Sequence, residues 1–272
     1  MQSLIKDLHT LKNGQKIAIY KNFHKTGDEG YAKGEEFLGI TVPQLRKLAI
    51  KYQDTSFHDI KKLLRSRIHE EKYLAALILV EKYQKHDESA RVFGNEVSEA
   101  SKIVDFRSLD ARGAVGPRHE REKNSRKKVF DFCIENASLF SGWDLVDTVA
   151  PSIFGHFLYH MGRDYPAYKK LLANLAKSSN LWERRIAIIS TSYFIRQNQF
   201  DETIKISEIL LNDCHDLIHK AVGWMLREVG KKDISSLKGF LNNHYKEMPR
   251  TMLRYAIEKF PEKERQKYLK RA

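Results

Sequence analysis

The sequence predicts an all-α protein in which antiparallel helix pairs stack into a curved α-solenoid with a basic concave face. Apolar residues recur with the period of a helix in successive segments of roughly 10–18 residues, joined by short connectors. Prolines number 6 and glycines 14 among 272 residues, and alternating segments typical of strands are nearly absent. Strict identity between repeats is not visible, so we expect one domain, residues 1–272, that is repetitive in architecture only.

The segment "HEEKYLAALILVEKYQK", residues 69–85, gives the clearest helical pattern. It places Leu74, Leu77 and Ile78 at positions i, i+3 and i+4, on one face. Residues 42–52 begin with a proline suited to a first helical turn. Further helices are predicted over residues 57–66, 165–178, 181–197, 201–213, 217–230, 235–245 and 251–260.

Two regions break the helical pattern. Residues 23–40 are rich in glycine and predict an ordered but irregular loop. Residues 88–118 combine mixed charge and weak periodicity with a Gly/Pro-rich end, which predicts an insertion or flexible segment holding at most a short helix. The basic stretch "HEREKNSRKK" follows, and we favour a solvated helix face there over a nuclear-localisation signal.

The charge balance points to a polyanionic partner. Lys and Arg total 48 against 35 for Asp and Glu, a formal net charge of +13, and nucleic acid is the usual partner of such a surplus. No apolar run reaches the ~20 residues of a membrane span, and the N-terminus lacks the pattern of a signal peptide. With only 2 cysteines, we expect no disulfide framework and a reducing, cytoplasmic location, with the nucleus as the alternative in a eukaryotic cell. We also expect a monomer.

Residues 215–232 form a helix with two distinct faces. Ile218, Val222, Met225 and Val229 fall on a core stripe, whereas Trp224 groups with Lys220, Arg227 and Lys231 on a face directed away from it. One interpretation is a tryptophan packed against the next repeat between solvated lysines. The other is a surface where cations grip phosphates and the indole stacks on a sugar.

The stretch "GWDLVDTVAP" places Trp143 and Asp147 one helical turn apart, so their side chains are neighbours. Pro151 cannot donate to the Asp147 carbonyl, which predicts a kink or break there. Asp144 suits the first turn of a helix. Asp147 is interpreted either as the partner of an arginine or as an anion held where positive charge develops during a reaction.

The stretch "SSNLWERRIAI" resembles a capping box, with Asn180 as the cap and Glu183 three residues later. Arg185 could lock a buried carboxylate or grip a phosphate, and both interpretations stay open. For Trp182, packing at the helix start is favoured over a role in a site.

Metal and cofactor sites find little support. The pairs His156/His160 and His215/His219 have the spacing i, i+4, but neither has the glutamate of an HExxH motif, and no cysteine spacing supports zinc. The sequence contains no phosphate-binding loop, dinucleotide fingerprint or nucleophile elbow. We therefore predict no metal and no cofactor.

Five motifs in order carry a family resemblance: "YAKGEEFLGITVPQLRKL", "WDLVD", "LWERRIAI", "HKAVGWMLREVGK" and "MPRTMLRYAIEKFP". Together the chain resembles the AlkD family of alkylpurine DNA glycosylases, over roughly residues 1–87 and 119–270. The resemblance implies a right-handed array of HEAT-like repeats that wraps duplex DNA on its concave face. Residues 88–118 depart from the family pattern.

The resemblance also implies roles for individual residues. Asp147 corresponds to the catalytic carboxylate, Trp143 and Trp224 to the two site tryptophans, and Arg185 and Arg227 to arginines that grip DNA. The implied activity is hydrolysis of the N-glycosidic bond of cationic N3- or N7-alkylated purines in duplex DNA, through an oxocarbenium-like state, with the base left outside any pocket. The alternative is a non-catalytic protein that binds bent or branched DNA or RNA, and a weaker one is a protein-binding solenoid.

Overall fold

The computed structural model describes residues 1–27, 30–85, 117–162, 165, 168 and 170–270. In this part of the chain the regular secondary structure is helical and no β-strand is present, although one isolated parallel bridge joins Glu36 and Ile68. The helices are α1 (Gln2–Thr10), α2 (Gly14–Phe23), α3 (Val42–Lys51), α4 (Phe57–Leu64), α5 (His69–Gln84), α6 (Pro117–Glu135), η3 (Ala137–Leu139), α7 (Trp143–Val149), η4 (Ala150–Gly155), α8 (His156–Met161), α9 (Leu171–Ala176), α10 (Leu181–Arg196), α11 (Asp201–Ile209), α12 (Asp216–Lys232), α13 (Ile234–His244), α14 (Arg250–Ala256) and α15 (Glu262–Leu269).

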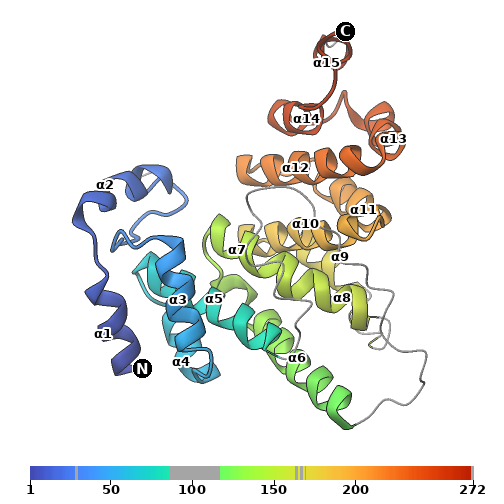
Figure 1. Ribbon diagram of the computed structural model, residues 1–272. Helices are drawn as coiled ribbons and strands as arrows, with labels where there is room; N and C mark the ends of the chain where they lie inside the picture. Colours follow the sequence, from blue (N-terminus) through green and yellow to red (C-terminus); the bar gives the residue numbers. More distant parts are fainter. Residues whose placement is uncertain (28–29, 86–116, 163–164, 166–167, 169, 271–272) are drawn as a thin grey trace.

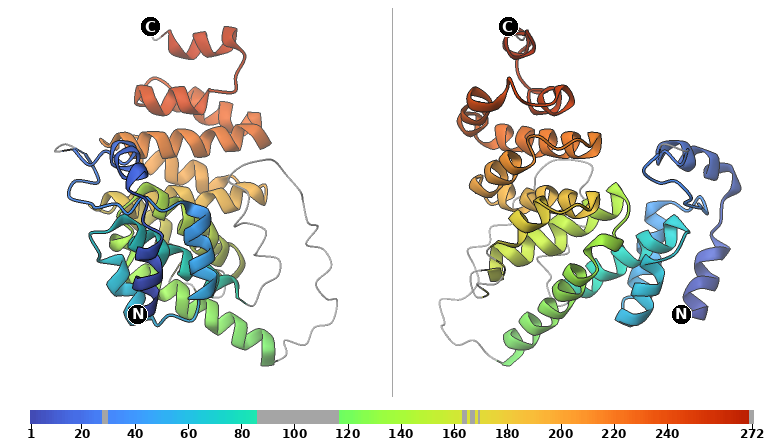
Figure 2. Two further views of the ribbon diagram at one scale, coloured as in Figure 1. Left: turned by 60° about the vertical axis from the view of Figure 1, so that its left-hand side comes forward. Right: turned by 180° about the vertical axis from the view of Figure 1, so that it is seen from behind.

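The helices are stacked in chain order, and the two termini lie at opposite ends of the molecule (Figures 1 and 2). Two long helices form the centre: α5 packs against α3, α4, α6 and α7, whereas α10 packs against α7, η4, α9, α11 and α12. Helix α12 continues the stack onto α13 and α14. The all-helical prediction is confirmed, and the stacked layers are consistent with a solenoid.

The predicted core positions are buried. Leu74 and Ile78 of α5 are fully buried, as are Ile218, Val222 and Val229 of α12. The expected insertion, residues 88–118, lies outside the described residues except for its last two, which begin α6. The basic stretch that follows belongs to that helix. The helix predicted over residues 165–178 is shorter, and α9 covers only Leu171–Ala176.

The loop between α2 and α3 is irregular, as predicted, and it is fixed by a buried glutamate. The Glu70 carboxylate accepts hydrogen bonds from the backbone amides of Leu38, Gly39 and Ile40 at 2.8–3.2 Å. Gly39 has a φ of +77°, and a Cβ there would lie 2.2 Å from the Asn13 carbonyl oxygen. The loop is therefore held against α5 and against the start of α2.

Pro151 interrupts the α-helix, as expected, and the interruption takes the form of a π-helical segment. Helix α7 ends at Val149, the π-helical η4 follows, and α8 begins directly after it. The wider π turn accommodates a residue that has no N–H for the carbonyl four residues earlier. Val149 and Ile153 are both fully buried on either side of Pro151.

Close packing of α12 on α14 requires a glycine at position 223. A Cβ at Gly223 would lie 2.5 Å from both the Met252 carbonyl oxygen and the Tyr255 Cβ. We expect Gly223→Ala to lower the free energy of unfolding by about 1–3 kcal/mol, because overpacking outweighs the better helix propensity of alanine.

Urea denaturation checks this prediction, with Gly239→Ala as the matched control. Gly239 also lies in a helix, α13, but a Cβ there would meet nothing within 4 Å. The control should therefore gain about 0.5–1 kcal/mol. Equal gains for both variants would contradict the role of Gly223 in packing.

Candidate active site

Asp147 and Arg185 form a bidentate ion pair that joins α7 to α10. Arg185 donates from Nε to Asp147 Oδ1 at 3.0 Å and from Nη2 to Oδ2 at 2.8 Å. The Arg185 side chain is 6% exposed and that of Asp147 is 18% exposed. Such fork-to-carboxylate geometry is stronger and more directional than a single contact. The carboxylate is therefore held in one orientation at the edge of the buried core.

Arg185 also reaches the next helix. Its Nη1 donates to the Leu217 carbonyl oxygen at 2.7 Å, so all three guanidinium nitrogens have partners. Burial raises the pKa of Asp147, and the Arg185 guanidinium works against that rise. Of the two interpretations left open for Arg185, the structure shows the first: Arg185 binds a carboxylate, that of Asp147. Its role as a phosphate contact stays a prediction.

Trp143 begins α7 and is half-buried among aromatic side chains from the α2 end. Its indole stacks on the His24 ring at 5.6 Å with an interplanar angle of 17°, and the Phe23 ring meets it edge-on at 5.4 Å. Tyr31 lies nearby: burial raises the pKa of its hydroxyl, and the Trp143 indole works against that rise. Tyr31 also meets Trp182 edge-on at 6.2 Å.

Asp144, the neighbour of Trp143, belongs to a buried charged network. His69 donates from Nε2 to Asp144 Oδ2 at 2.8 Å and from Nδ1 to Glu35 Oε2 at 2.7 Å. The Lys72 ammonium pairs with Glu35 and also donates to Ser141 Oγ at 3.0 Å. The first-turn position predicted for Asp144 is correct, but its carboxylate binds His69.

The two carboxylates keep His69 protonated. Burial alone would lower the pKa of His69, but Asp144 and Glu35 outweigh burial and raise that pKa from 6.5 to about 9. Burial works to raise the pKa of Asp144, yet the attraction of His69 lowers it. Burial also works to raise the pKa of Glu35, but His69 and Lys72 together lower it. Glu35, His69, Asp144 and Lys72 thus form a network of alternating charge.

Donor atoms of His24, His69 and Asp144 lie within 4.8 Å of one another, which is close enough for a metal ion to be considered. His69, however, donates from both ring nitrogens, and an imidazolium has no lone pair for a metal. The two histidine pairs that were considered for metal binding from their spacing make other contacts. His156 and His160 contact the hydroxyls of Tyr83 and Tyr193, each at 2.8 Å. His215 caps α12.

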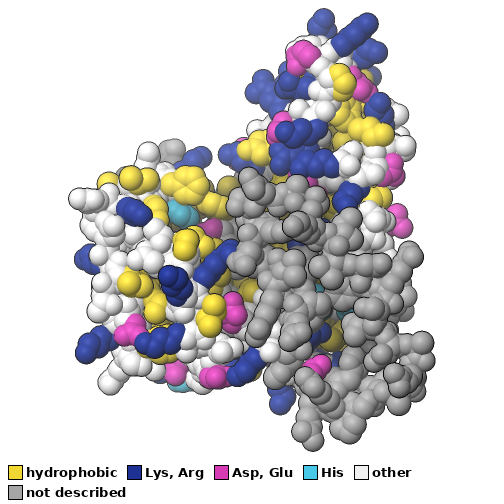
Figure 3. All heavy atoms as spheres, in the orientation of Figure 1, with side chains coloured by type: hydrophobic (Ala, Val, Ile, Leu, Met, Phe, Trp, Pro, Cys, Tyr) yellow, Lys and Arg dark blue, Asp and Glu magenta, His cyan; other side chains and the backbone are white. Residues whose placement is uncertain are grey.

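The cations predicted on α12 lie opposite its core stripe, and each has an acidic partner. Lys220 pairs with Asp216 at 2.7 Å and Lys231 with Glu228 at 2.8 Å. Arg227 pairs with Glu258, close to α14. Figure 3 shows the same mixture, with Lys and Arg interspersed with Asp and Glu over the C-terminal helices.

Trp224 is half-buried on α12 and packs against the core. Among the ring contacts of the described residues, none joins it to Trp143. The structure thus brings together Trp143, Asp147 and Arg185, while the convergence of Trp224 with them stays a prediction. Trp182 is buried, as favoured, and Asn180 Oδ1 caps α10 by accepting from the amides of Trp182 and Glu183. The Glu183 side chain binds Ser178 instead of completing a capping box.

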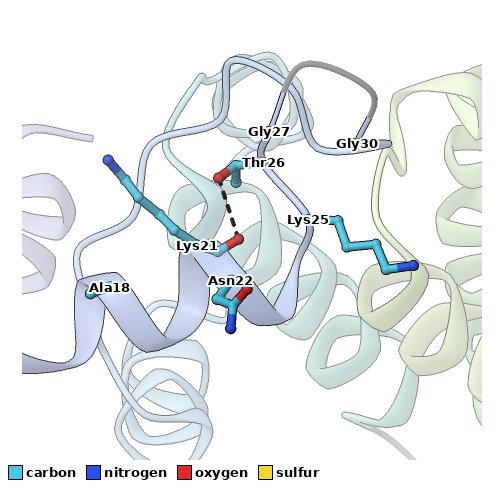
Figure 4. A pocket seen from close by; sticks show the side chains of 7 residues that line it. All are labelled: Ala18, Lys21, Asn22, Lys25, Thr26, Gly27 and Gly30. Atoms are coloured by element: carbon cyan, nitrogen blue, oxygen red, sulfur yellow. Dashed lines mark hydrogen bonds between the residues drawn. The ribbon is translucent and has the colours of Figure 1, made fainter.

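A hollow of about 760 Å³ lies at the end of α2. Its lining includes the exposed Lys21 and Lys25, which extend in opposite directions in Figure 4. Neither lysine has an acidic partner within 4.0 Å in the described part of the chain. Phe23 lies between them and is 62% exposed, although it touches Trp143. Two exposed lysines that form no close ion pair with a described residue, and one exposed ring, therefore lie beside the candidate site.

Comparisons with known proteins identify the family. The sequence matches the family model described as DNA alkylation repair enzyme over residues 4–260. The chain belongs to this family, whose description supports an enzyme of DNA alkylation repair. No described helix is long and apolar enough to cross a membrane.

A solved structure described as a predicted DNA alkylation repair enzyme from Enterococcus faecalis has a similar fold; it has a TM-score of 0.59 and 15% identity, covering 92% of this chain and 97% of that one. Another is AlkD2 from Streptococcus mutans, with a TM-score of 0.48 and 19% identity, covering 91% of this chain and 98% of that one. No curated protein matches the sequence significantly.

Proposed function

We propose that this protein is a DNA glycosylase that hydrolyses the N-glycosidic bond of cationic N3- or N7-alkylated purines in duplex DNA. The observation that carries the proposal is the Asp147 carboxylate, held by Arg185 one turn from the half-exposed Trp143, in a member of a DNA alkylation repair family. An alkylated purine already carries positive charge and leaves readily, so the main barrier is the charge that builds on the deoxyribose. A fixed carboxylate stabilises that charge.

The Arg185 contact leaves the carboxylate able to act. An ionised carboxylate has about four lone-pair sites, and the bidentate contact occupies two of them. The remaining sites can face the sugar C1′ and orient a water molecule. In this proposal Arg185 positions Asp147, and the Trp143 indole face adds charge–quadrupole stabilisation of the sugar cation. Trp224 is proposed to supply a second indole face, and Arg227, Lys220 and Lys231 to contact phosphates.

Base release by the wild-type protein tests this function. Purified protein should release 7-methylguanine or 3-methyladenine from methylated duplex DNA, and the product is measured by mass spectrometry. The rival function is non-catalytic binding of bent or branched DNA or RNA, which fits the net charge of +13 equally well. Tight DNA binding without any base release would favour that rival.

We further propose that Lys21 and Lys25 contact DNA phosphates next to the lesion. They lie beside Trp143 through the intervening Phe23 and His24, and, unlike Lys220 and Lys231, they form no ion pair within 4.0 Å among the described residues. Lys25 still lies near enough to Asp216 to help lower the pKa of that carboxyl group, so Lys21 is the less compensated of the two. A lysine in an ion pair brings a carboxylate close to the DNA phosphates, and that carboxylate weakens the contact. A lysine without a close ion pair can neutralise a phosphate fully, and it therefore releases more counterions from the DNA.

The salt dependence of DNA binding checks this assignment. Replacing both Lys21 and Lys25 by Gln should lower the slope of log Kd against log salt concentration by about 2, because each phosphate contact contributes roughly 0.9. Lys263→Gln, an exposed position on the distant α15, is the control and should change the slope little. An unchanged slope in the Lys21/Lys25 variant would contradict this assignment, and a reduced slope in Lys220→Gln would then leave the phosphate contacts to α12 alone.

A further inference from the structure

A stack of aromatic rings leads from the interior to the candidate site. Phe37 stacks on His69 with centroids 4.9 Å apart, His69 contacts His24 at 4.3 Å, and His24 stacks on Trp143 at 5.6 Å. Phe37, His69 and His24 are buried, while Trp143 is only half-buried. Phe37 also contacts His24 at 5.2 Å, so the three buried rings fix one another, and the column that they form reaches the half-buried Trp143 indole through His24.

The column is anchored at His69 by carboxylates from two other segments. Glu35 comes from the loop before α3, and Asp144 from the first turn of α7, directly after Trp143. The residue that caps α7, Gly142, has no side chain that could fix this turn. The His69–Asp144 contact therefore fixes the end of the helix that carries both Trp143 and Asp147.

Stability alone does not account for this network. A buried ion network gains little over well-packed apolar residues, because removing its charges from water offsets their attraction. Two buried atoms, His24 Nδ1 and Asp144 Oδ1, also have no hydrogen-bond partner among the described residues. What the network does provide is one defined placement of the rings and of the start of α7.

We propose that His24 and His69 are positioning residues that hold the Trp143 indole in its working orientation beside Asp147. Neither histidine contacts the reacting atoms: His69 fixes Asp144 and the His24 ring, and His24 fixes the indole. The inference rests on the proposed glycosylase function, since it assigns Trp143 a working orientation. It adds a support that reaches from the loop before α3 through α5 to α7.

A pair of substitutions at His24 separates ring stacking from folding. His24→Ala removes the stacking ring and should lower kcat for 7-methylguanine release by roughly 10-fold to 100-fold, with KM for DNA little changed, because a small misplacement of a reacting group costs about that much. His24→Phe keeps a flat ring and should restore most of the rate. A His24→Ala variant that is folded and works at the wild-type kcat would overturn the proposal.

The indole signal of Trp143 gives a readout that does not depend on activity. Its N–H cross-peak, assigned with Trp143→Phe, should shift in His69→Gln and broaden in His24→Ala. In the wild type this peak should also move with a midpoint near pH 9, as His69 loses its proton between Glu35, Lys72, Asp144 and His24, and the movement should be absent in His69→Gln.

The outcomes distinguish this inference from the proposed function. If wild-type protein releases no base but the indole peak follows His24 and His69 as described, the glycosylase proposal fails while the support of Trp143 stands. If base is released normally and the peak is unmoved in both histidine variants, the glycosylase proposal stands and the positioning role is wrong.

Discussion

Asp147→Asn should lower the rate of 7-methylguanine release from methylated duplex DNA by about 10²–10³-fold, comparable to the loss of one strong electrostatic stabiliser. Asparagine has nearly the same shape but carries no charge, so it stabilises a sugar cation poorly. The variant should still bind DNA, because the carboxylate contributes nothing favourable to phosphate contacts. Single-turnover base release and DNA binding, measured on the same preparation, check both expectations.

The chain offers a matched control for Asp147→Asn. Arg184, the neighbour of Arg185 on α10, donates from Nε to Asp213 Oδ2 at 2.6 Å. The Asp213 side chain is 5% exposed, compared with 18% for Asp147. Asp213→Asn breaks an equivalent pair, so it should lower stability in the same way while leaving the rate of base release near that of the wild type. Equal losses of rate in the two variants would mean that Asp147 acts through folding, and an unchanged rate in Asp147→Asn would remove it from the mechanism.

Arg185→Met should lower the free energy of unfolding by about 3–5 kcal/mol, because it leaves a carboxylate at the edge of the core without its partner. It should also raise the pKa of Asp147 further, since burial raises that pKa and the Arg185 guanidinium is what works against it. Base release should therefore fall most at low pH and be partly regained as pH rises and Asp147 ionises.

The stability of Arg185→Met should also depend on the protonation of Asp147, but it should fall with rising pH whereas base release increases. A carboxyl group whose pKa is raised in the folded state favours folding most when it is protonated, so the loss of stability should be smallest in acid and should grow as pH rises through the folded pKa. Urea denaturation across pH measures this trend, with Arg184→Met as the control that leaves Asp147 paired. A loss of stability that is the same at every pH would contradict the buried carboxylate as its cause.

Local periodicity was enough to predict most of the fold. The spacing of Leu74, Leu77 and Ile78 predicts α5, and the two faces of α12 follow from the same period. The N-terminal helices α1 and α2 were not predicted. Leu4 and Leu8 of α1 have helical spacing and are buried, which was a usable signal, but α2 buries none of its residues and so leaves no apolar stripe in the sequence.

The candidate site was predictable only where its members share a helix or a family motif. Trp143 and Asp147 are one turn apart, and Arg185 was already interpreted as a lock for a carboxylate. The contacts of His24 with Trp143 and of His69 with Asp144 join residues 119 and 75 positions apart, and no spacing in the sequence indicates them. The pairing of Arg227 with Glu258 was missed for the same reason.

The three contacts of Arg185 have a mechanical consequence. One guanidinium binds the Asp147 side chain on α7 and the Leu217 carbonyl oxygen on α12, while its own backbone belongs to α10. In a stacked array, each layer otherwise touches only its neighbours, and bending is shared among many soft interfaces. Here a change in curvature between α7 and α12 must strain or break one of these bonds. Bending of the array between these layers would therefore also move the Asp147 carboxylate, so the shape of the array is coupled to the orientation of the candidate catalytic group.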